Sequence, residues 1–345
     1  MDTGTWILVI GVIAIALAFD VINGFHDAAN SIATIVSTRV LSPRLAVIWA
    51  AFFNLLAMII FHQAKVADTV GSIVKIRAGD PAFIYVVMCG LIGAIMWDII
   101  TWYLGLPTSS SHALIGGLLG AGLVHGGINV INWGKVGKTV LFIPLAPMIG
   151  LVLGFIIMVA VIWIVHKLYP ATVDRIFRKC QFISAAFYSL GHGGNDAQKT
   201  MGIICALLVA AGLRDPDTQL QITHWNSLWI ILSCQLAMAV GTAFGGWRIV
   251  KTMGMKITKL KPVNGFCAET AGAITLFGST YLGIPVSTTH TITGAIIGVG
   301  ATNKLSGIKW GVAERIVWAW VVTIPLSALI AALCYWAISA VHPAF

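Results

Sequence analysis

The longest uninterrupted apolar run of the chain extends from Val140 to Val165, and comparable runs recur along the sequence. About 20 apolar residues in a helix span the hydrocarbon core of a bilayer. Because 58% of the 345 residues are hydrophobic and only 10% are charged, a soluble globular fold is excluded. We predict an all-α, polytopic membrane protein with roughly eight to ten hydrophobic segments, some too short to cross alone.

The distribution of the charged residues indicates whether the chain binds nucleic acid or lies in a membrane. A net charge of +9 could indicate nucleic-acid binding, but Lys and Arg lie between the apolar runs rather than in one region. That distribution is typical of the positive-inside rule, so we expect a multi-pass protein of the cell membrane, with the lipid bilayer and no nucleic acid as partner. The six cysteines form no close pairs, and their spacing predicts neither a disulfide framework nor a zinc site.

A polar motif from Gly24 to Thr34 follows the first apolar run and contains Asp27. A bare carboxylate near mid-bilayer costs about 2.5 to 3.5 kcal/mol, so such residues usually face a cavity, a partner or an ion path. An interfacial loop is the alternative interpretation. We expect the helix to break at Gly24 and a short segment rich in small residues to follow.

The same pattern recurs later in the chain. Aligning Asp27 with Asp196 pairs two aspartate motifs at an offset of 169 residues, and a second, hydroxyl-rich motif, Gly105 to Gly116, matches Gly283 to Gly294 at an offset of 178. Two unrelated motifs repeated in one order indicate duplication. Internal repeats interrupted by Gly, Pro and hydroxyl residues point to the binding site of a transporter.

The duplication predicts the domain organisation. The first repeat would cover residues 1–165 and the second 182–345, joined by a short basic cytoplasmic linker at 166–181. The loops 65–81 and 248–261 occupy matching positions but differ in charge bias, which favours repeats inverted across the membrane. We therefore expect broken helices or re-entrant hairpins that meet at the midplane.

The hydroxyl motifs suit an oxyanion. Proline ahead of Ser and Thr favours a helix N-terminus, where free N–H groups and about half a positive charge attract anions. A transporter must also release its substrate, and none of the four motifs contains Arg. The candidate donors are Ser109, Ser110, Ser111, Ser287, Thr288 and Thr289.

The aspartates pose the opposite problem. A carboxylate about 4 Å from an anion is repelled by about 4 kcal/mol at an effective dielectric of 20, so a proton or a metal cation must intervene. Asp27 and Asp196 are therefore expected to bind the coupling ion, and the coupling is reciprocal. Lys199 occupies the position of Asn30 in the second motif. We hypothesise that Lys199 partly replaces a metal ion and favours protons over sodium; neutralising Asp196 or snorkelling outwards are the alternatives.

Other polar residues carry two interpretations each. Asp98 has no acidic counterpart in the second half and could handle protons or be paired with a donor. His112 and His290 could shuttle protons or be packing groups. Asn54 is expected to bond between helices. His26 lacks a second ligand at suitable spacing, so no resident metal is predicted.

The four motifs resemble the signature motifs of the PiT family of inorganic phosphate transporters. They occur in family order, and the likeness covers nearly the whole chain. The resemblance implies a symporter of phosphate with protons or sodium, in bacteria sometimes as a neutral metal–phosphate complex. It also implies that Asn30 and Asn195 join the aspartates and hydroxyls at the site, and we add Thr200 from the second aspartate motif. Lys199 is similar to the proton-linked bacterial branch.

Several alternatives stay open at this level. Sulfate is also tetrahedral and is carried by some members of the family, and sodium could replace protons. A channel would need a continuous polar pore. An enzyme using Ser111 and His112 is not expected, because adjacent helical residues point in different directions and no orienting acid accompanies them. We expect no cofactor, import across the bacterial inner membrane, and a homodimer as one option.

Overall fold

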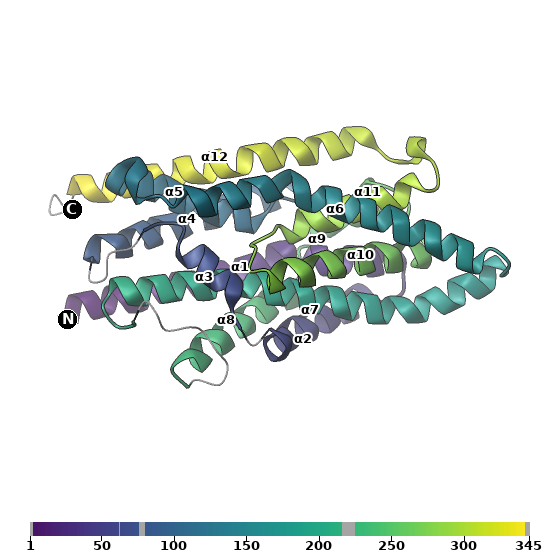
Figure 1. Ribbon diagram of the computed structural model, residues 1–345, viewed down its shortest axis with the longest axis horizontal. Helices are drawn as coiled ribbons and strands as arrows, with labels where there is room; N and C mark the ends of the chain where they lie inside the picture. Colours follow the sequence, from purple (N-terminus) through teal and green to yellow (C-terminus); the bar gives the residue numbers. More distant parts are fainter. Residues whose placement is uncertain (1–2, 62, 76–79, 216–224, 342–345) are drawn as a thin grey trace.

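The computed structural model describes residues 3–61, 63–75, 80–215 and 225–341, and in these ranges the regular elements are helices apart from one isolated bridge between Val74 and Ile131. Seven helices of the described part are long and apolar enough to cross a membrane. The long helices run side by side along one direction (Figure 1). The prediction of an all-α polytopic membrane protein is confirmed.

The two halves contain similar series of helices. The first half comprises α1 (Thr3–Ser37), α2 (Pro43–Ile60), α3 (Lys65–Gly71), α4 (Pro81–Leu104), α5 (Ser110–Gly126), η1 (Gly127–Val130) and α6 (Trp133–Val165). The second comprises α7 (Pro170–Ala210), α8 (Trp225–Phe244), α9 (Trp247–Lys251), η2 (Thr252–Lys256), α10 (Pro262–Tyr281), α11 (Thr288–Ala301), η3 (Leu305–Gly307) and α12 (Trp310–Val341).

The aspartate motifs lie inside continuous helices. The predicted break at Gly24 is wrong, because α1 is helical through the whole motif and α7 likewise. A side chain at Gly24 would lie 2.3 Å from the carbonyl oxygen of Met238 on α8, and one at Gly193 would lie 2.6 Å from that of Asn54 on α2. These glycines serve close helix contact rather than a chain break.

The hydroxyl motifs begin short helices, as predicted. Each motif starts at a glycine with positive φ, Gly105 at 65° and Gly283 at 69°, which ends the preceding helix and turns the chain. After a few extended residues α5 and α11 begin. The side-chain oxygens of Ser109 and Ser287 accept from the backbone N–H groups of His112 and His290, at 3.3 and 3.2 Å. Both serines are therefore N-caps.

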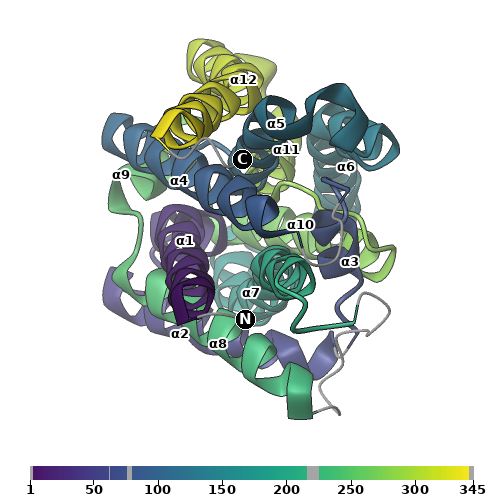
Figure 2. The same ribbon diagram turned by 90° about the vertical axis from the view of Figure 1, so that its left-hand side faces the viewer.

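The halves interlock by exchanging partners. Helix α1 packs on α8 while α7 packs on α2, and α5 packs on α12 while α11 packs on α6 (Figure 2). Glycines permit these contacts: an added Cβ would lie 2.0 Å from the Ala328 oxygen at Gly120 and 2.1 Å from the Leu151 oxygen at Gly298. Equivalent contacts therefore recur in the two halves, and their inversion across the membrane stays a prediction.

Two connecting segments are more helical than expected. Residues 166–169 alone join α6 to α7, and residues 170–181 of the predicted linker form the first turns of α7. The stretch from residue 65 to 81, expected to be a mixed loop, contains α3, which packs against α7. The second half thus begins as one long helix that carries its aspartate motif.

Candidate functional site

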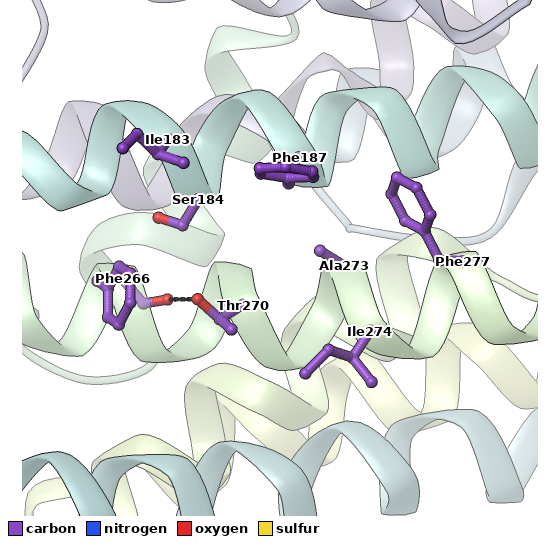
Figure 3. Close-up of a pocket in the computed structure, with 8 residues that line it drawn as sticks. All are labelled: Ile183, Ser184, Phe187, Phe266, Thr270, Ala273, Ile274 and Phe277. Carbon is purple, nitrogen blue, oxygen red and sulfur yellow. Dashed lines mark hydrogen bonds between the residues drawn. The ribbon is translucent and has the colours of Figure 1, made fainter. Parts of the chain in front are cut away.

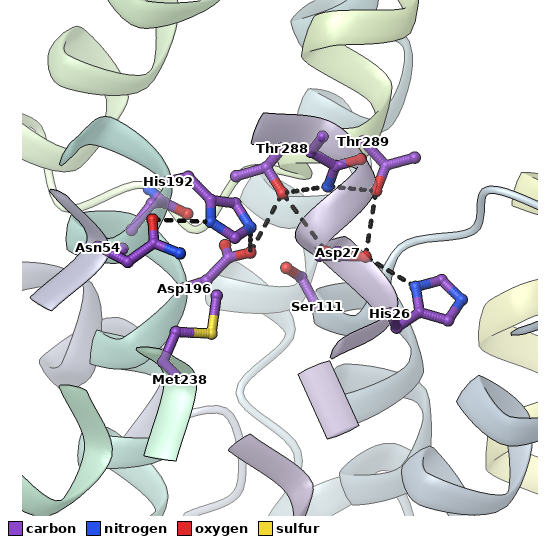
Figure 4. A network of polar contacts seen from close by, with 12 residues as sticks. His26, Asp27, Asn54, Ser111, His192, Asp196, Met238, Thr288 and Thr289 are labelled. Carbon is purple, nitrogen blue, oxygen red and sulfur yellow. Dashed lines mark hydrogen bonds and ion pairs between the residues drawn. The ribbon is translucent and has the colours of Figure 1, made fainter. Parts of the chain in front are cut away.

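The two aspartates of the repeat meet at the N-terminus of α11. The Thr288 hydroxyl lies 3.1 Å from Asp196 Oδ2 and 3.4 Å from Asp27 Oδ2, and Thr289 lies 3.5 Å from Asp27 Oδ1 (Figure 4). Asp27 and Asp196 are 2% and 0% exposed, so neither charge is solvated by bulk water. The predicted convergence of both aspartate motifs with a hydroxyl motif is present in the structure.

Lys199 joins both repeats. Its ammonium group donates to Asp196 Oδ1, to the Ser111 hydroxyl on α5 and, at 3.0 Å, to the carbonyl oxygen of Val286. The side chain is fully buried at 1% exposure, which rules out snorkelling in this conformation. Lys199 therefore neutralises Asp196 and anchors the starts of α5 and α11.

Asn30 occupies the equivalent place beside Asp27 but makes neutral contacts. Its amide nitrogen donates to the hydroxyls of Thr288 at 3.0 Å and Thr289 at 2.9 Å. Its amide oxygen has no hydrogen-bond partner among the described residues. Asn30 thus orients the two threonines whose hydroxyls face the carboxylates.

His26 is the cationic or neutral neighbour of Asp27. Its Nδ1 lies 2.7 Å from Asp27 Oδ1, and its Nε2 lies 3.1 Å from the Thr101 hydroxyl on α4. The Thr108 hydroxyl lies 3.4 Å from the same Nε2 and donates to Thr101. His26 is therefore held between Asp27 on one side and two hydroxyls on the other.

Asp98 lies behind His26 on α4. Its charge interacts with those of His26 and Asp27, and its two oxygens have no hydrogen-bond partner of standard geometry in the described ranges. The Ser110 hydroxyl at the start of α5 is a donor that faces Asp98, so pairing with a donor and proton handling both stay open for this residue. Asp98 adds negative potential to the first-repeat side of the site.

The remaining predicted residues lie around this centre. Asn195 donates to Thr280 at 2.9 Å and to the Ile284 carbonyl at 3.4 Å, which fixes the turn before α11. The oxygens of Ser109 and Ser287 are occupied as caps. The hydroxyls of Ser110 and Thr200 have no hydrogen bond of standard geometry in the described structure, and they face the buried acids Asp98 and Asp20. Substrate contact by these five residues stays a prediction.

His192 was not predicted as a site residue. Its Nε2 lies 3.3 Å from Asp196 Oδ2, and its Nδ1 lies 3.3 Å from the Asn54 amide oxygen. Asn54 also donates to Thr242 on α8, so the expected interhelical role of Asn54 is confirmed. The signal for His192 was its position one turn before Asp196, which places both on one helix face.

A second polar cluster surrounds Glu269 on α10. The carboxylate accepts from Thr34 at 2.6 Å, from Gln181 at 2.9 Å and from Ser184 at 2.5 Å, and it is 0% exposed. Two helices supply these donors, α1 with Thr34 and α7 with Gln181 and Ser184. Sequence reasoning singled out no partners for Glu269, because Gln181 was placed in a linker.

One part of the site has the composition of a cation site. Ligand atoms of Asp27, His192 and Asp196 lie within 4.8 Å of one another, and all three side chains are buried. The hydroxyl of Thr288 stands between the two carboxylates. The arrangement can accept one added positive charge, and its oxygen and nitrogen atoms do not select among cations by themselves.

The motif histidines pack against each other. The rings of His112 and His290 meet edge to face with centroids 4.7 Å apart, and His290 stacks on Trp320 at 3.8 Å. Both rings are buried. This geometry favours the packing interpretation over a proton shuttle.

An apolar cavity of about 380 Å³ lies apart from this site, between α7 and α10. Phe187, Phe266 and Phe277 supply much of its lining (Figure 3). Ile183 and Ile274 in the same lining are 60% and 52% exposed, so the cavity opens on the outer surface of the helices. Its two hydroxyl groups already donate within the protein, Ser184 to Glu269 and Thr270 to the Phe266 carbonyl.

The membrane-spanning helices, together with a buried polar site to which both repeats contribute, define a multi-pass membrane transporter. The model of the phosphate transporter family matches residues 23–331, and the chain belongs to that family. It is 56% identical over 332 residues to a probable low-affinity inorganic phosphate transporter of Rhizobium meliloti (strain 1021), with 96% of each chain covered. A Bacillus subtilis (strain 168) protein of the same description is 42% identical, over 95% of this chain and 96% of the relative.

A solved structure has the same fold. The protein described as the sodium-dependent phosphate transporter superposes with a TM-score of 0.84 at 25% identity, covering 96% of this chain and 99% of that chain. The resemblance drawn from the four motifs is thus confirmed, and the chain is a transporter rather than an enzyme.

Proposed function

We propose that this protein imports inorganic phosphate across the cell membrane together with protons. The observation that carries the proposal is the meeting of Asp27, Asp196 and Lys199 with the hydroxyls of α5 and α11. The family and the bacterial relatives, described as low-affinity inorganic phosphate transporters, support phosphate as the substrate.

The anion would be held by donors rather than by fixed charges. The helices α5 and α11 begin at the site, and the first N–H groups of a helix have no intrahelical partner; Ser111, Thr288 and Thr289 add hydroxyls. Lys199 supplies one cation that is already shared with Asp196. Such a site binds a tetrahedral oxyanion and lets it go again.

Proton coupling follows from the charge count at Thr288. One hydroxyl hydrogen cannot satisfy two carboxylates, so the site lacks a positive charge as long as both aspartates are ionised. Lys199 compensates Asp196, which leaves Asp27 as the acid that needs a partner. A proton shared between Asp27 and His26 would provide it, and phosphate would then bind without the repulsion of about 4 kcal/mol between charges 4 Å apart.

Sodium is the competing coupling ion. The solved neighbour is described as sodium-dependent, and the oxygens of Asp27, Asp196 and Thr288 could also surround a sodium ion. Uptake of radiolabelled phosphate into proteoliposomes decides between them. We expect uptake in sodium-free buffer that collapses with a protonophore; strict dependence on sodium would contradict proton coupling.

Three versions of the same uptake assay test which form of the substrate is carried and whether the protein is a carrier. Counterflow of labelled phosphate shows a carrier and distinguishes it from a channel. We expect unlabelled sulfate to compete weakly, because an acceptor such as Asp27 can bond the phosphate proton and sulfate has none at neutral pH. Removing divalent metal with a chelator should leave uptake unchanged if free phosphate is carried, and should abolish it if a metal–phosphate complex is carried.

A further inference from the structure

Helix α1 carries another buried acid that the proposed mechanism does not use. Asp20 precedes Asp27 by seven residues, which is about two helical turns and places both on the same side of α1. It is 0% exposed, and neither carboxylate oxygen has a hydrogen bond of standard geometry within the described residues. Burying an unpaired carboxylate costs free energy, so we expect Asp20 to bind a proton or a cation.

Two polar side chains beside Asp20 would contact a proton or cation bound there. Asn23 on α1 and Thr200 on α7 are the polar side chains nearest to the carboxylate. The amide oxygen of Asn23 and the hydroxyl of Thr200 have no hydrogen bond of standard geometry in the described structure. The Thr200 hydroxyl and the Asn23 amide nitrogen can donate to the ionised carboxylate, and their oxygens can accept from the protonated one.

We propose that Asp20 is a proton-binding residue of the transport cycle, distinct from Asp27, with Asn23 and Thr200 as the hydrogen-bonding partners of its carboxyl group. A protonated carboxyl group has an O–H donor, and an amide or hydroxyl oxygen accepts it. Proton uptake forms this O–H bond with a proton from water on one side, and release breaks it and returns the proton to water on the other. This inference rests on the proposed proton coupling.

The charge of Asp20 reaches the central site through Lys199. The titratable groups facing Asp20 are Asp196 and Lys199 from α7 and the Cys234 thiol from α8. With Asp20 ionised, the Lys199 ammonium is attracted by two acids, Asp196 in direct contact and Asp20 at longer range. Protonation of Asp20 leaves more of that positive charge to Asp196 and to an anion bound beside it. Proton and phosphate therefore favour each other's binding, and this coupling is reciprocal.

The second repeat provides a matched control. The offset of the aspartate motifs places Ser189 of α7 at the position of Asp20, and Ser189 is equally buried. Its hydroxyl donates to the Ala185 carbonyl at 2.8 Å and has no acid to protonate. Substituting Ser189→Ala perturbs an equivalent place in the fold without changing a charge.

The test compares accumulation with exchange in proteoliposomes for the wild type, Asp20→Asn, Asp20→Glu and Ser189→Ala. With a gradient of about one pH unit, Asp20→Asn is expected to lose about tenfold in phosphate accumulation, because each coupled proton contributes a factor of about ten per unit. Counterflow at equal pH continues in this variant. Asp20→Glu keeps accumulation but shifts the pH of half-maximal uptake, and Ser189→Ala behaves like the wild type.

Several outcomes overturn the assignment. Wild-type accumulation in Asp20→Asn does so, and so does a parallel loss of counterflow, which would mean a role in the fold or in substrate binding. Sodium-driven uptake that depends on Asp20 would make it a sodium residue instead. A wild type that ignores the pH gradient contradicts the proposed coupling itself, whereas a responsive wild type with an equally responsive Asp20→Asn contradicts Asp20 alone.

Infrared spectroscopy gives a readout without transport. The purified wild type should show the carbonyl band of a protonated buried carboxyl group in the difference spectrum between acidic and alkaline pH. Because Asp27, Asp98 and Glu269 are also buried, one component of this band should be missing from Asp20→Asn and present in Ser189→Ala. An identical band in all three proteins would contradict protonation of Asp20.

Discussion

The two aspartate motifs have equivalent positions and different electrostatics. Asp196 on α7 has a buried ammonium group from Lys199 and the ring of His192 beside it, whereas Asp27 on α1 has the ring of His26 and hydroxyl donors. The matching glycines make the same kind of helix contact in both halves. Duplication has preserved the packing, and the differences Asn30/Lys199, His26/Asn195 and Asn23/His192 have separated the electrostatics of the halves.

The largest effects are expected when each aspartate is neutralised. Asp27→Asn should abolish accumulation driven by a pH gradient while the purified protein stays nearly as stable as the wild type. Asp196→Asn should also abolish accumulation and should unfold more easily, because the buried Lys199 loses its counter-charge at a cost of about 3 to 5 kcal/mol. Uptake and thermal unfolding in detergent measure both quantities. Near-normal accumulation in either variant, or equal stability of the two, would refute the comparison.

Lys199→Asn makes the second motif like the first. The substitution leaves Asp196 buried and unpaired, so stability should fall by a similar amount, about 3 to 5 kcal/mol. The double variant Asp196→Asn with Lys199→Asn should recover much of this loss, since neither charge is then left alone. A double-mutant cycle of unfolding free energies measures the coupling, and simple additivity would show that the pair does not interact.

The same Lys199→Asn variant also tests the choice of coupling ion. If Lys199 stands in for a metal ion, uptake in sodium-free buffer should fall, and added sodium should partly restore it. Restoration should be missing in Ser189→Ala and in the wild type, where sodium has nothing to replace. Unchanged sodium-free uptake in Lys199→Asn would contradict this role of the ammonium group.

Asn30→Ala and Asn195→Ala compare the amides of the two motifs. Asn30 makes two hydrogen bonds to the threonines that face the carboxylates, each worth about 0.5 to 1.5 kcal/mol, so the KM for phosphate should rise by about tenfold. Asn195 holds the turn before α11, and its loss should lower stability more than it raises KM. Initial-rate uptake and thermal unfolding separate the effects; equal changes in KM would contradict the distinction.

The smallest effects are expected at the N-caps. Ser109→Ala and Ser287→Ala each remove one cap, which costs about 1 kcal/mol of stability. The loss should be the same in both repeats, because the two caps have the same geometry. Thermal unfolding is the measurement, and a difference well beyond this amount between the two variants would show that one serine also serves the substrate.

Much of the site could be predicted from the sequence because the repeat marks it twice. The matching motifs identified Asp27, Asp196 and the hydroxyl residues, and the sequence Pro-Thr-Ser-Ser-Ser predicted the start of α5 correctly. The exchange of Asn30 for Lys199 was visible only because the copies could be aligned. The family followed from the same four motifs.

Other features depend on contacts that a sequence does not reveal. Glycine predicted a break at Gly24, whereas the neighbouring backbone of Met238 makes glycine necessary inside an intact helix. The donors of Glu269 come from α1 and α7, far away in the chain. His192 lies one turn before its acid, and this spacing is common enough among buried histidines that only the structure assigns the contact.

The exchanged partners of α5 and α12 have a consequence for biogenesis. The glycine side of α5 fits against Ala328 of α12, the last helix of the described residues. The first half therefore cannot reach its final form while the ribosome is still translating the second. Assembly is completed only after the C-terminal helix has entered the bilayer, and fragments divided at residues 166–169 should mature only when both are made in one cell.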